Sequence, residues 1–392
     1  MREQMKLLKH SAGRLRWLWA PLLALLVTRL LVAAAAYFST PILEDSNIPG
    51  YHERPDAILL DALCSRWDTG FYVSIATEGY RYEGVQFPSV AFFPLLPMLM
   101  RAVMLVTGDP LTAGVLVSNL ALAGAALLYY RLVADQGGEQ QAERAVWYLL
   151  LFPASFFGSA VYSESLFLLF SIAALLLARR KRWLAAALCA SLAGLTRLVG
   201  ILVFGMLLVE WWQQRRRESP EQRPGLRSLA WLGVAPLGTA TYLLYLQLVF
   251  GDALAFLRAS AAWARQPSSP WSAVASLFER PQQGWSAALE SGALPLDNWL
   301  DLSFVLLFLG LGLALLLRRR WSEAAFVLAG VLLPISSGML MSQRRYMWVL
   351  FPGFTRLAEW GENPWVDRVV VSLSAAGLGL FTALFSNWYW VA

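Results

Sequence analysis

The residues best suited to chemistry lie between positions 64 and 94, where a polar and aromatic stretch interrupts a sequence made mostly of apolar runs. Its central carboxylate is Asp68, and the pattern around it predicts a helix over 65–78 with Ser65 as N-cap and Gly79 as the stop. Asp68 would then lie in the first turn, where the helix dipole favours the ionised form that a general base needs. A carboxylate that only completes a capping interaction with Ser65 explains the pattern equally well.

Two further ionisable residues adjoin apolar segments. Glu164 opens an apolar helix, and an ionisable group near membrane depth is a functional candidate by default. A first-turn carboxylate at the water boundary is the alternative. Arg197 lies between two apolar half-helices, where an arginine needs an anion, either a protein carboxylate such as Glu164 or a ligand phosphate.

Arg344 and Arg345 are adjacent at an expected outer span end, against the usual bias of basic residues towards the cytoplasm. The planar guanidinium suits phosphate, so both are candidate phosphate ligands; snorkelling to lipid headgroups is the alternative. His10 and His52 form no metal-binding pattern, and no glycine-rich nucleotide loop is present. The sequence therefore predicts neither a metal nor another cofactor, and a cytosolic nucleotide-sugar donor is not supported.

The composition predicts the kind of protein that must position these residues. Of the 392 residues, 58% are hydrophobic and only 15% are charged, with a mean hydropathy of +0.51. Continuous Leu, Ala and Val runs predict an all-α polytopic membrane protein, with residues 1–392 as a single transmembrane domain. The net charge of +6 is no nucleic-acid signal, because Lys and Arg form short blocks at span ends. Cys64 and Cys189 give no disulfide framework.

The basic blocks at 179–182, 215–217 and 318–320 predict the cytoplasmic face. The segment 39–110 carries nine acidic residues and four Lys or Arg, so we expect it outside as a large helical loop. A second external loop is expected at 251–299. About eleven spans are expected, at 17–38, 112–133, 145–160, 163–179, 183–197, 198–212, 229–250, 301–317, 322–340, 345–360 and 367–388.

Three details follow from this assignment. The first run, 17–38, is longer than a usual signal peptide, so an uncleaved first span is expected, with a cleaved signal as the alternative. To keep the basic blocks inside, 91–107 must be an interfacial or re-entrant helix of the outer loop. Two short helices must also meet near Arg197. The same assignment places Asp68, Arg197 and Arg345 on one side of the membrane.

These residues resemble the PIG-V family, the dolichol-phosphate-mannose-dependent mannosyltransferases of glycolipid anchor assembly and their bacterial relatives, within the GT-C superfamily. The matching patches are Trp67-Asp68 with Ile75-Ala76 and Gly79-Tyr80, Phe92-Phe93-Pro94 with Pro97, Tyr162 to Phe167, Thr196-Arg197 with Gly200, Arg345-Tyr346 with Phe351-Pro352, and, more weakly, Trp263 with Arg265.

The resemblance implies a GT-C type fold, a polyprenyl-phosphate sugar donor and transfer on the non-cytoplasmic side with inversion. It implies no required metal, and it makes Asp68 the candidate base. Arg345, Arg344 and Arg197 would bind the donor phosphate. The sugars and the acceptor would be bound by Glu164, Tyr162, Tyr72, Tyr80, Arg66, Trp67, Trp263 and Arg265.

We therefore expect a multi-pass glycosyltransferase, in a bacterial plasma membrane with an outward-facing site, that moves a sugar such as mannose to a hydroxyl of a glycolipid, glycan or protein. Its partners would be the lipid-linked donor, the acceptor and membrane lipids, without nucleic acid. A lipid-linked sugar flippase is one alternative, which would share the arginines but not need Asp68 as base. A non-catalytic subunit of a membrane complex is another.

Overall fold

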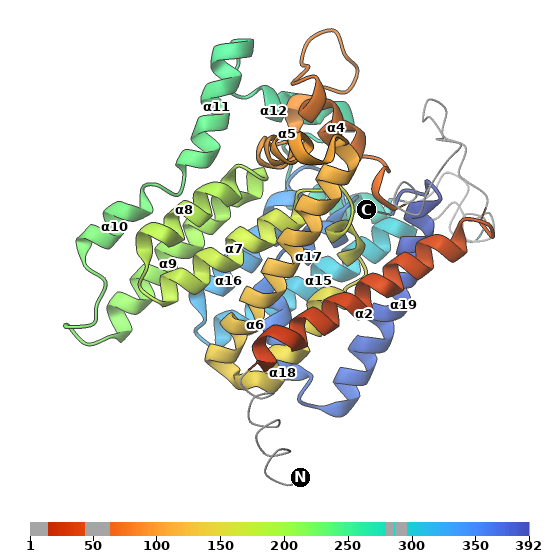
Figure 1. The fold of residues 1–392 in the computed structure, drawn as a ribbon. Helices are drawn as coiled ribbons and strands as arrows, with labels where there is room; N and C mark the ends of the chain where they lie inside the picture. The colour runs from red at the N-terminus through yellow and green to blue at the C-terminus, as the bar shows by residue number, and fades with distance from the viewer. Residues whose placement is uncertain (1–14, 44–62, 280–285, 287–295, 392) are drawn as a thin grey trace.

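The computed structural model describes residues 15–43, 63–279, 286 and 296–391. Within these residues, the regular elements are helices, as Figure 1 shows, which confirms the all-α prediction. The N-terminal basic residues and parts of both expected external loops lie outside the described residues.

The first span is one uninterrupted helix, α2 (Arg16–Ser39), close to the range expected from its hydrophobicity. Its buried side recurs every fourth residue with small side chains, at Ala20, Ala24, Thr28, Val32 and Ala36. Small residues on one stripe let helix backbones approach closely in a membrane. This stripe accordingly packs α2 against α6 and α19.

The segment after α2 holds two helices that pack together, α4 (Thr69–Thr77) and α5 (Leu95–Thr107), with the short 3-10 turn η1 (Ser89–Ala91) between them. The 13 residues of α5 span about 20 Å, well short of the ~30 Å hydrocarbon core. That length agrees with the expectation that 91–107 does not cross the membrane, which stays a prediction.

The next helix, α6 (Pro110–Leu151), is 42 residues long and is bent at Gly138, whose φ of 80° only glycine adopts readily. The expected span at 145–160 is therefore wrong in its bounds. The helical segment after the bend ends at Leu151, where Pro153 follows, and a 3-10 turn, η2 (Ser155–Gly158), continues the chain.

Two short helices do meet beside Arg197, as expected. They are α8 (Trp183–Gly194) and α9 (Ile201–Arg217), joined by η3 (Leu198–Gly200), and Arg197 itself has extended backbone. The preceding helix, α7 (Glu164–Arg179), begins at the candidate residue Glu164 and ends at Arg179 in the first basic block. It therefore connects the region of the candidate residues to the region of the basic blocks.

The expected span 229–250 is broken into α10 (Leu226–Leu232) and α11 (Leu237–Phe250), with Gly233 and Pro236 in the break. Both lie at the edge of the molecule, away from α2 and α19 (Figure 1). Short helices follow, namely α12 (Ala255–Ala259), η4 (Ser260–Trp263), α13 (Pro270–Ala275) and η5 (Ser276–Phe278).

The last part of the chain holds two long helices, α15 (Leu296–Leu317) and α19 (Pro364–Ser386), with α16 (Trp321–Ile335) after α15. The single span expected at 345–360 is instead two short helices, α17 (Gln343–Trp348) and α18 (Phe351–Trp360), because Pro352 starts a new helix.

Among the described residues, five helical segments are long and apolar enough to cross a membrane, counting α10 and α11 together. The expected count of about eleven spans is therefore not established by helix length.

Candidate active site

A cavity of about 430 Å³ lies where α4, the start of α7, the Arg197 bend and α17 meet. We call it the site cavity. Its lining residues include Asp68, Arg197, Arg345 and Ser163, the residue before Glu164. Its lining combines these polar groups with aromatic side chains, which suits a ligand that has both hydroxyl groups and apolar faces.

Three charged side chains that line this cavity, Asp68, Arg197 and Arg345, form a chain of ion pairs with Glu164, which is buried behind them. Arg345 Nη1 donates to Asp68 Oδ2 at 2.7 Å, and Arg345 Nε donates to Glu164 Oε1. Arg197 Nη1 donates to the same Glu164 oxygen. Asp68, Arg345, Glu164 and Arg197 therefore alternate in charge, as two carboxylates and two guanidiniums from four distant segments.

Burial makes this arrangement costly to disturb. Glu164 is fully buried and Arg345 is 6% exposed. The other carboxylate oxygen of Glu164, Oε2, has no hydrogen-bond partner in the described part of the chain. A charge buried in this way is tolerated only when paired, so removal of one partner should be strongly unfavourable.

Two tyrosines hold the backbone around the carboxylates. The Tyr162 hydroxyl accepts from the Asp68 N–H at 3.1 Å and donates to the Arg66 carbonyl at 3.2 Å. The Tyr72 hydroxyl donates to Ser163 Oγ at 3.1 Å. Burial, and then the Asp68 charge, raises the pKa of Tyr162 well above its usual value, and burial with the Glu164 charge raises that of Tyr72. Both phenols therefore stay protonated.

Asp68 is placed by an unusual conformation of the residue before it. Trp67 has φ of 54°, in the left-handed region that residues with side chains seldom adopt. Its ring packs edge-on against Trp388 and Trp390, with centroids 5.9 and 4.9 Å away. The expected helix over 65–78 is wrong at its start for this reason, because the turn at Trp67 delays the helix until Thr69.

The capping alternative for Asp68 is not seen. Asp68 occupies the N-cap position of α4, but its side chain makes no cap hydrogen bond and instead contacts Arg345. The expected stop is confirmed, since Gly79 has φ of 96° and its N–H bonds to the carbonyls of the last turn.

Residues 15–271 match the family model described as Mannosyltransferase (PIG-V), which is well over half of the chain. The chain belongs to this family. The family expected from the motifs is thereby confirmed. Asp68, Glu164 and Arg197 lie within the matched residues of this PIG-V family member, whereas Arg345 lies beyond them.

Comparison with the curated proteins found no match. Among solved structures, similar chains include the oligosaccharyltransferase of Archaeoglobus fulgidus in its apo form, at 12% identity and a TM-score of 0.47 over 95% of this chain and 56% of that one. Another is the archaeal oligosaccharyltransferase AglB from Archaeoglobus fulgidus in complex with an inhibitory peptide and a dolichol-phosphate, at 14% identity and 0.44, over 96% and 56%. The chain spans a little over half of their length. Both TM-scores are below 0.5, so neither likeness bears on function.

Arg344 differs from its neighbour Arg345 in this family member. Its side chain is buried against α15, where Nε donates to Asp301 Oδ1 at 2.8 Å and Nη2 lies 3.2 Å from Asp297 Oδ1. It does not line the site cavity. The expectation that Arg344 binds the donor phosphate is at odds with this geometry, because consecutive helical residues point in directions about 100° apart.

Five of the expected sugar-binding residues are not among the side chains that line the cavity, namely Glu164, Tyr162, Tyr80, Arg66 and Trp67. The Tyr80 hydroxyl donates to the Phe92 carbonyl at 2.8 Å, and Arg66 Nε donates to the Ser386 carbonyl at 3.0 Å. With Trp67, they support the segments that carry lining residues and are not lining residues themselves.

Trp263 and Arg265, from the second loop, do line the cavity. Trp263 packs on Phe92, and the Arg265 guanidinium lies over the Tyr346 ring at 5.4 Å. The motif reasoning missed Trp390, which also lines the cavity. Nothing in its local pattern separates it from the interfacial tryptophans that follow many spans.

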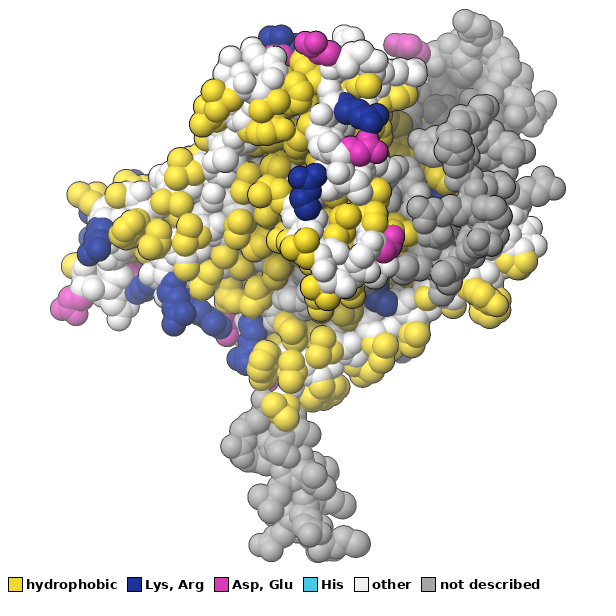
Figure 2. Space-filling model, turned by 45° about the horizontal axis from the view of Figure 1, so that its top comes forward, with side chains coloured by type: hydrophobic (Ala, Val, Ile, Leu, Met, Phe, Trp, Pro, Cys, Tyr) yellow, Lys and Arg dark blue, Asp and Glu magenta, His cyan; other side chains and the backbone are white. Residues whose placement is uncertain are grey.

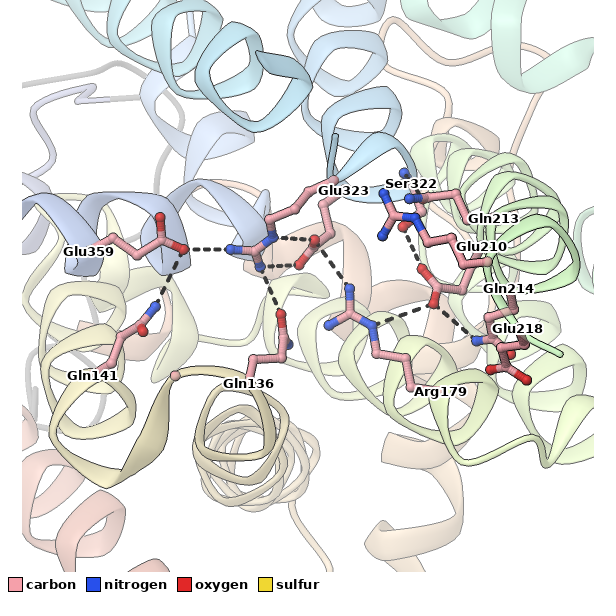
Figure 3. Close-up of a pocket in the computed structure, with 13 residues that line it drawn as sticks. Gln136, Gln141, Arg179, Glu210, Gln213, Gln214, Glu218, Ser322, Glu323 and Glu359 are labelled. Carbon is pink, nitrogen blue, oxygen red and sulfur yellow. Dashed lines mark hydrogen bonds and ion pairs between the residues drawn. The ribbon is translucent and has the colours of Figure 1, made fainter. Parts of the chain in front are cut away.

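A second polar cavity, of about 440 Å³, lies at the other end of α7 (Figure 3). Its carboxylates are tied to arginines, with Glu323 held by Arg179 at 3.1 Å and Glu359 by Arg320 at 2.7 Å. These pairs join the ends of α7, α16 and α18. We regard this cavity as a structural junction, and groups of three or more metal-ligating side chains are not found in the described ranges.

Proposed function

We propose that this protein is an integral membrane glycosyltransferase that moves a sugar, mannose by its family, from a polyprenyl-phosphate donor to an acceptor hydroxyl. The observation that carries the proposal is the Asp68–Arg345–Glu164–Arg197 chain of ion pairs, in which Asp68, Arg345 and Arg197 line one cavity and the buried Glu164 joins the two arginines. Membership of a mannosyltransferase family supports the same reaction class.

The proposed reaction is a single displacement at the anomeric carbon, with inversion. The acceptor hydroxyl forms the new bond to the sugar carbon while the bond from that carbon to the phosphate oxygen breaks. Asp68 takes the proton of the hydroxyl as general base. The lipid phosphate leaves with the bonding electron pair.

The arginines would stabilise the charge that develops on the leaving phosphate. Arg345 and Arg197 both line the cavity, and a guanidinium can hold two phosphate oxygens at once. A phosphate bound to Arg345 would take the place of one of its present carboxylate partners. Asp68 would then be free to accept a proton.

The position of the cavity supports transfer on the non-cytoplasmic side. Helix α7 has 16 residues and is therefore about 24 Å long; it begins beside the site cavity at Glu164 and ends in the basic block at Arg179. If the basic blocks face the cytoplasm, as such blocks usually do, the site cavity faces outward.

The proposal is tested by incubating purified protein with a panel of polyprenyl-phosphate sugars and hydroxyl acceptors. Acceptor-dependent release of lipid phosphate, with a product of inverted configuration, is the expected result. Transport of the lipid-linked sugar across a vesicle membrane without release of lipid phosphate would favour the flippase alternative instead.

A further inference from the structure

A third cavity, of about 680 Å³, opens between the start of α8 and helix α10, in the basic region after α7 and away from the site cavity. Its charged lining residues are all cationic, namely Lys181, Arg182 and Arg227. The cavity in Figure 3 differs, because Glu residues line it beside its arginines. The cavity beside α10 is therefore suited to an anion.

Two of its cations have no ionic partner of their own. Lys181 is paired with Glu218 at 2.7 Å, but neither Arg182 nor Arg227 makes a side-chain hydrogen bond or ion pair to any residue that the structure describes. Arg227 lies over the ring of Trp231, another lining residue, at 5.6 Å. Two guanidiniums without an ionic partner at one cavity are the groups best suited to bind a phosphate.

A buried donor lies in the same wall. Trp183, at the first position of α8, is 5% exposed and lines the cavity. Its indole N–H has no hydrogen-bond partner among the described residues. This nitrogen is shielded from the cavity, so Trp183 contributes only the carbon surface of its ring to the wall.

The apolar side of the cavity indicates that the anion is part of a lipid. Leu184 and Leu188 line it and are 39% and 50% exposed. The neighbouring helix α10 exposes Leu226 and Leu229, and it lies at the edge of the molecule in Figure 1. On the face that Figure 2 draws, Lys and Arg side chains gather along the lower left edge beside hydrophobic ones.

We propose that this cavity binds a glycerophospholipid with a net-anionic headgroup. Arg182 and Arg227 would hold the phosphate, and Leu184 and Leu188 would contact the acyl chains. A zwitterionic choline headgroup would bring its own cation against the two guanidiniums and so bind less well. This lipid-binding site is separate from the site cavity that Asp68 and Arg345 line. The proposal does not depend on glycosyl transfer.

The test is native mass spectrometry of the full chain, released from detergent after titration with phosphatidylglycerol or phosphatidylcholine of the same chain length. Wild-type protein should bind its first phosphatidylglycerol about 25-fold more tightly than phosphatidylcholine. Arg182→Gln with Arg227→Gln should remove that preference, since each basic residue near an anionic lipid contributes about fivefold.

The matched control is Arg216→Gln with Arg318→Gln, which removes the same charge from exposed arginines in neighbouring basic blocks that do not line the cavity. It should keep the preference. If the control loses the preference equally, or the cavity variant keeps it, the site is wrong. If inorganic phosphate stabilises the wild type against heating as much as phosphatidylglycerol does, the lipid occupant is wrong and the cavity holds a free anion.

Discussion

Asp68 and Arg345 are 277 positions apart in the sequence, and their side chains form an ion pair with 2.7 Å between Oδ2 and Nη1. The pair joins the start of α4 to α17, across the site cavity. In the proposed reaction, the same two residues receive the proton and hold the leaving phosphate. Because each is the ionic partner of the other, a substrate that uses both must first separate them.

Asp68→Asn tests the base. Asparagine keeps the size of the side chain and can still accept from Arg345, but it cannot take a proton. Turnover with the lipid-linked donor should fall by about 10² to 10⁴, while donor binding is retained. Glu78→Gln, which changes an exposed carboxylate that pairs with Arg81 near the same helix, is the control and should leave turnover unchanged. Near-normal transfer by Asp68→Asn would make Glu164 the next candidate.

Arg345→Lys tests the guanidinium. Lysine keeps the charge but cannot span Asp68 and Glu164 with a planar fork, so turnover should fall while the protein stays folded. Turnover of Arg345→Ala should be lower still, by about 10² to 10³ relative to wild type, if the arginine stabilises the departing phosphate. The measurement is the rate of lipid-phosphate release at saturating acceptor. Wild-type rates for both variants would rule out the phosphate role.

A substitution of the neighbouring Arg344 should lower the stability of the protein and not its binding of the donor. Arg344 is paired with Asp301, and both side chains are 2% exposed. Arg344→Ala should lower the free energy of unfolding by about 3–5 kcal/mol, because it leaves Asp301 buried without its partner. Adding Asp301→Ala should recover part of that loss. Thermal unfolding measures the effect, and a folded Arg344→Ala protein with normal stability but impaired donor binding would contradict the assignment.

Labelling tests the sidedness. Glu83→Cys, in the segment between α4 and α5, should react with an impermeant thiol reagent added outside intact cells. Asp109→Cys, after α5, should react from the same side. The substitution removes the capping bond that the Asp109 carboxylate accepts from the Thr112 N–H, at a cost of about 1 kcal/mol in stability. Glu221→Cys, between the basic blocks, should react only after permeabilisation. If Asp109→Cys reacts from the opposite side to Glu83→Cys, α5 crosses the membrane and the assignment fails.

Much of the scaffold could be predicted because the membrane imposes simple rules on sequence. Long apolar runs fixed the helical class, and a charged residue between two short runs indicated the break at Arg197. Charge bias placed Asp68, Arg197 and Arg345 on one side, and the structure brings all three to one cavity.

The rest depends on contacts between distant segments. The left-handed turn at Trp67 has no local signal, since it is held by tryptophans more than 300 positions away. The different partners of Arg344 and Arg345 could not be predicted from the local sequence, because the partner of Arg344, Asp301, lies on another helix. The expected spans 112–133 and 145–160 left a long break around Gly138, whereas the structure has helix on both sides of a bend at this one residue, because the polar residues next to it are helical as well.

The position of Arg345 between two carboxylates sets an order for product release. In the proposed reaction, Asp68 would carry the acceptor's proton after transfer and be neutral, so it would no longer compete for Arg345. The incoming donor competes with two carboxylates, Asp68 and Glu164, for the Arg345 guanidinium. The lipid phosphate product would compete with Glu164 alone. In the proposed reaction, we therefore expect the lipid product to leave more slowly than the donor binds, because one carboxylate competitor for Arg345 has been neutralised.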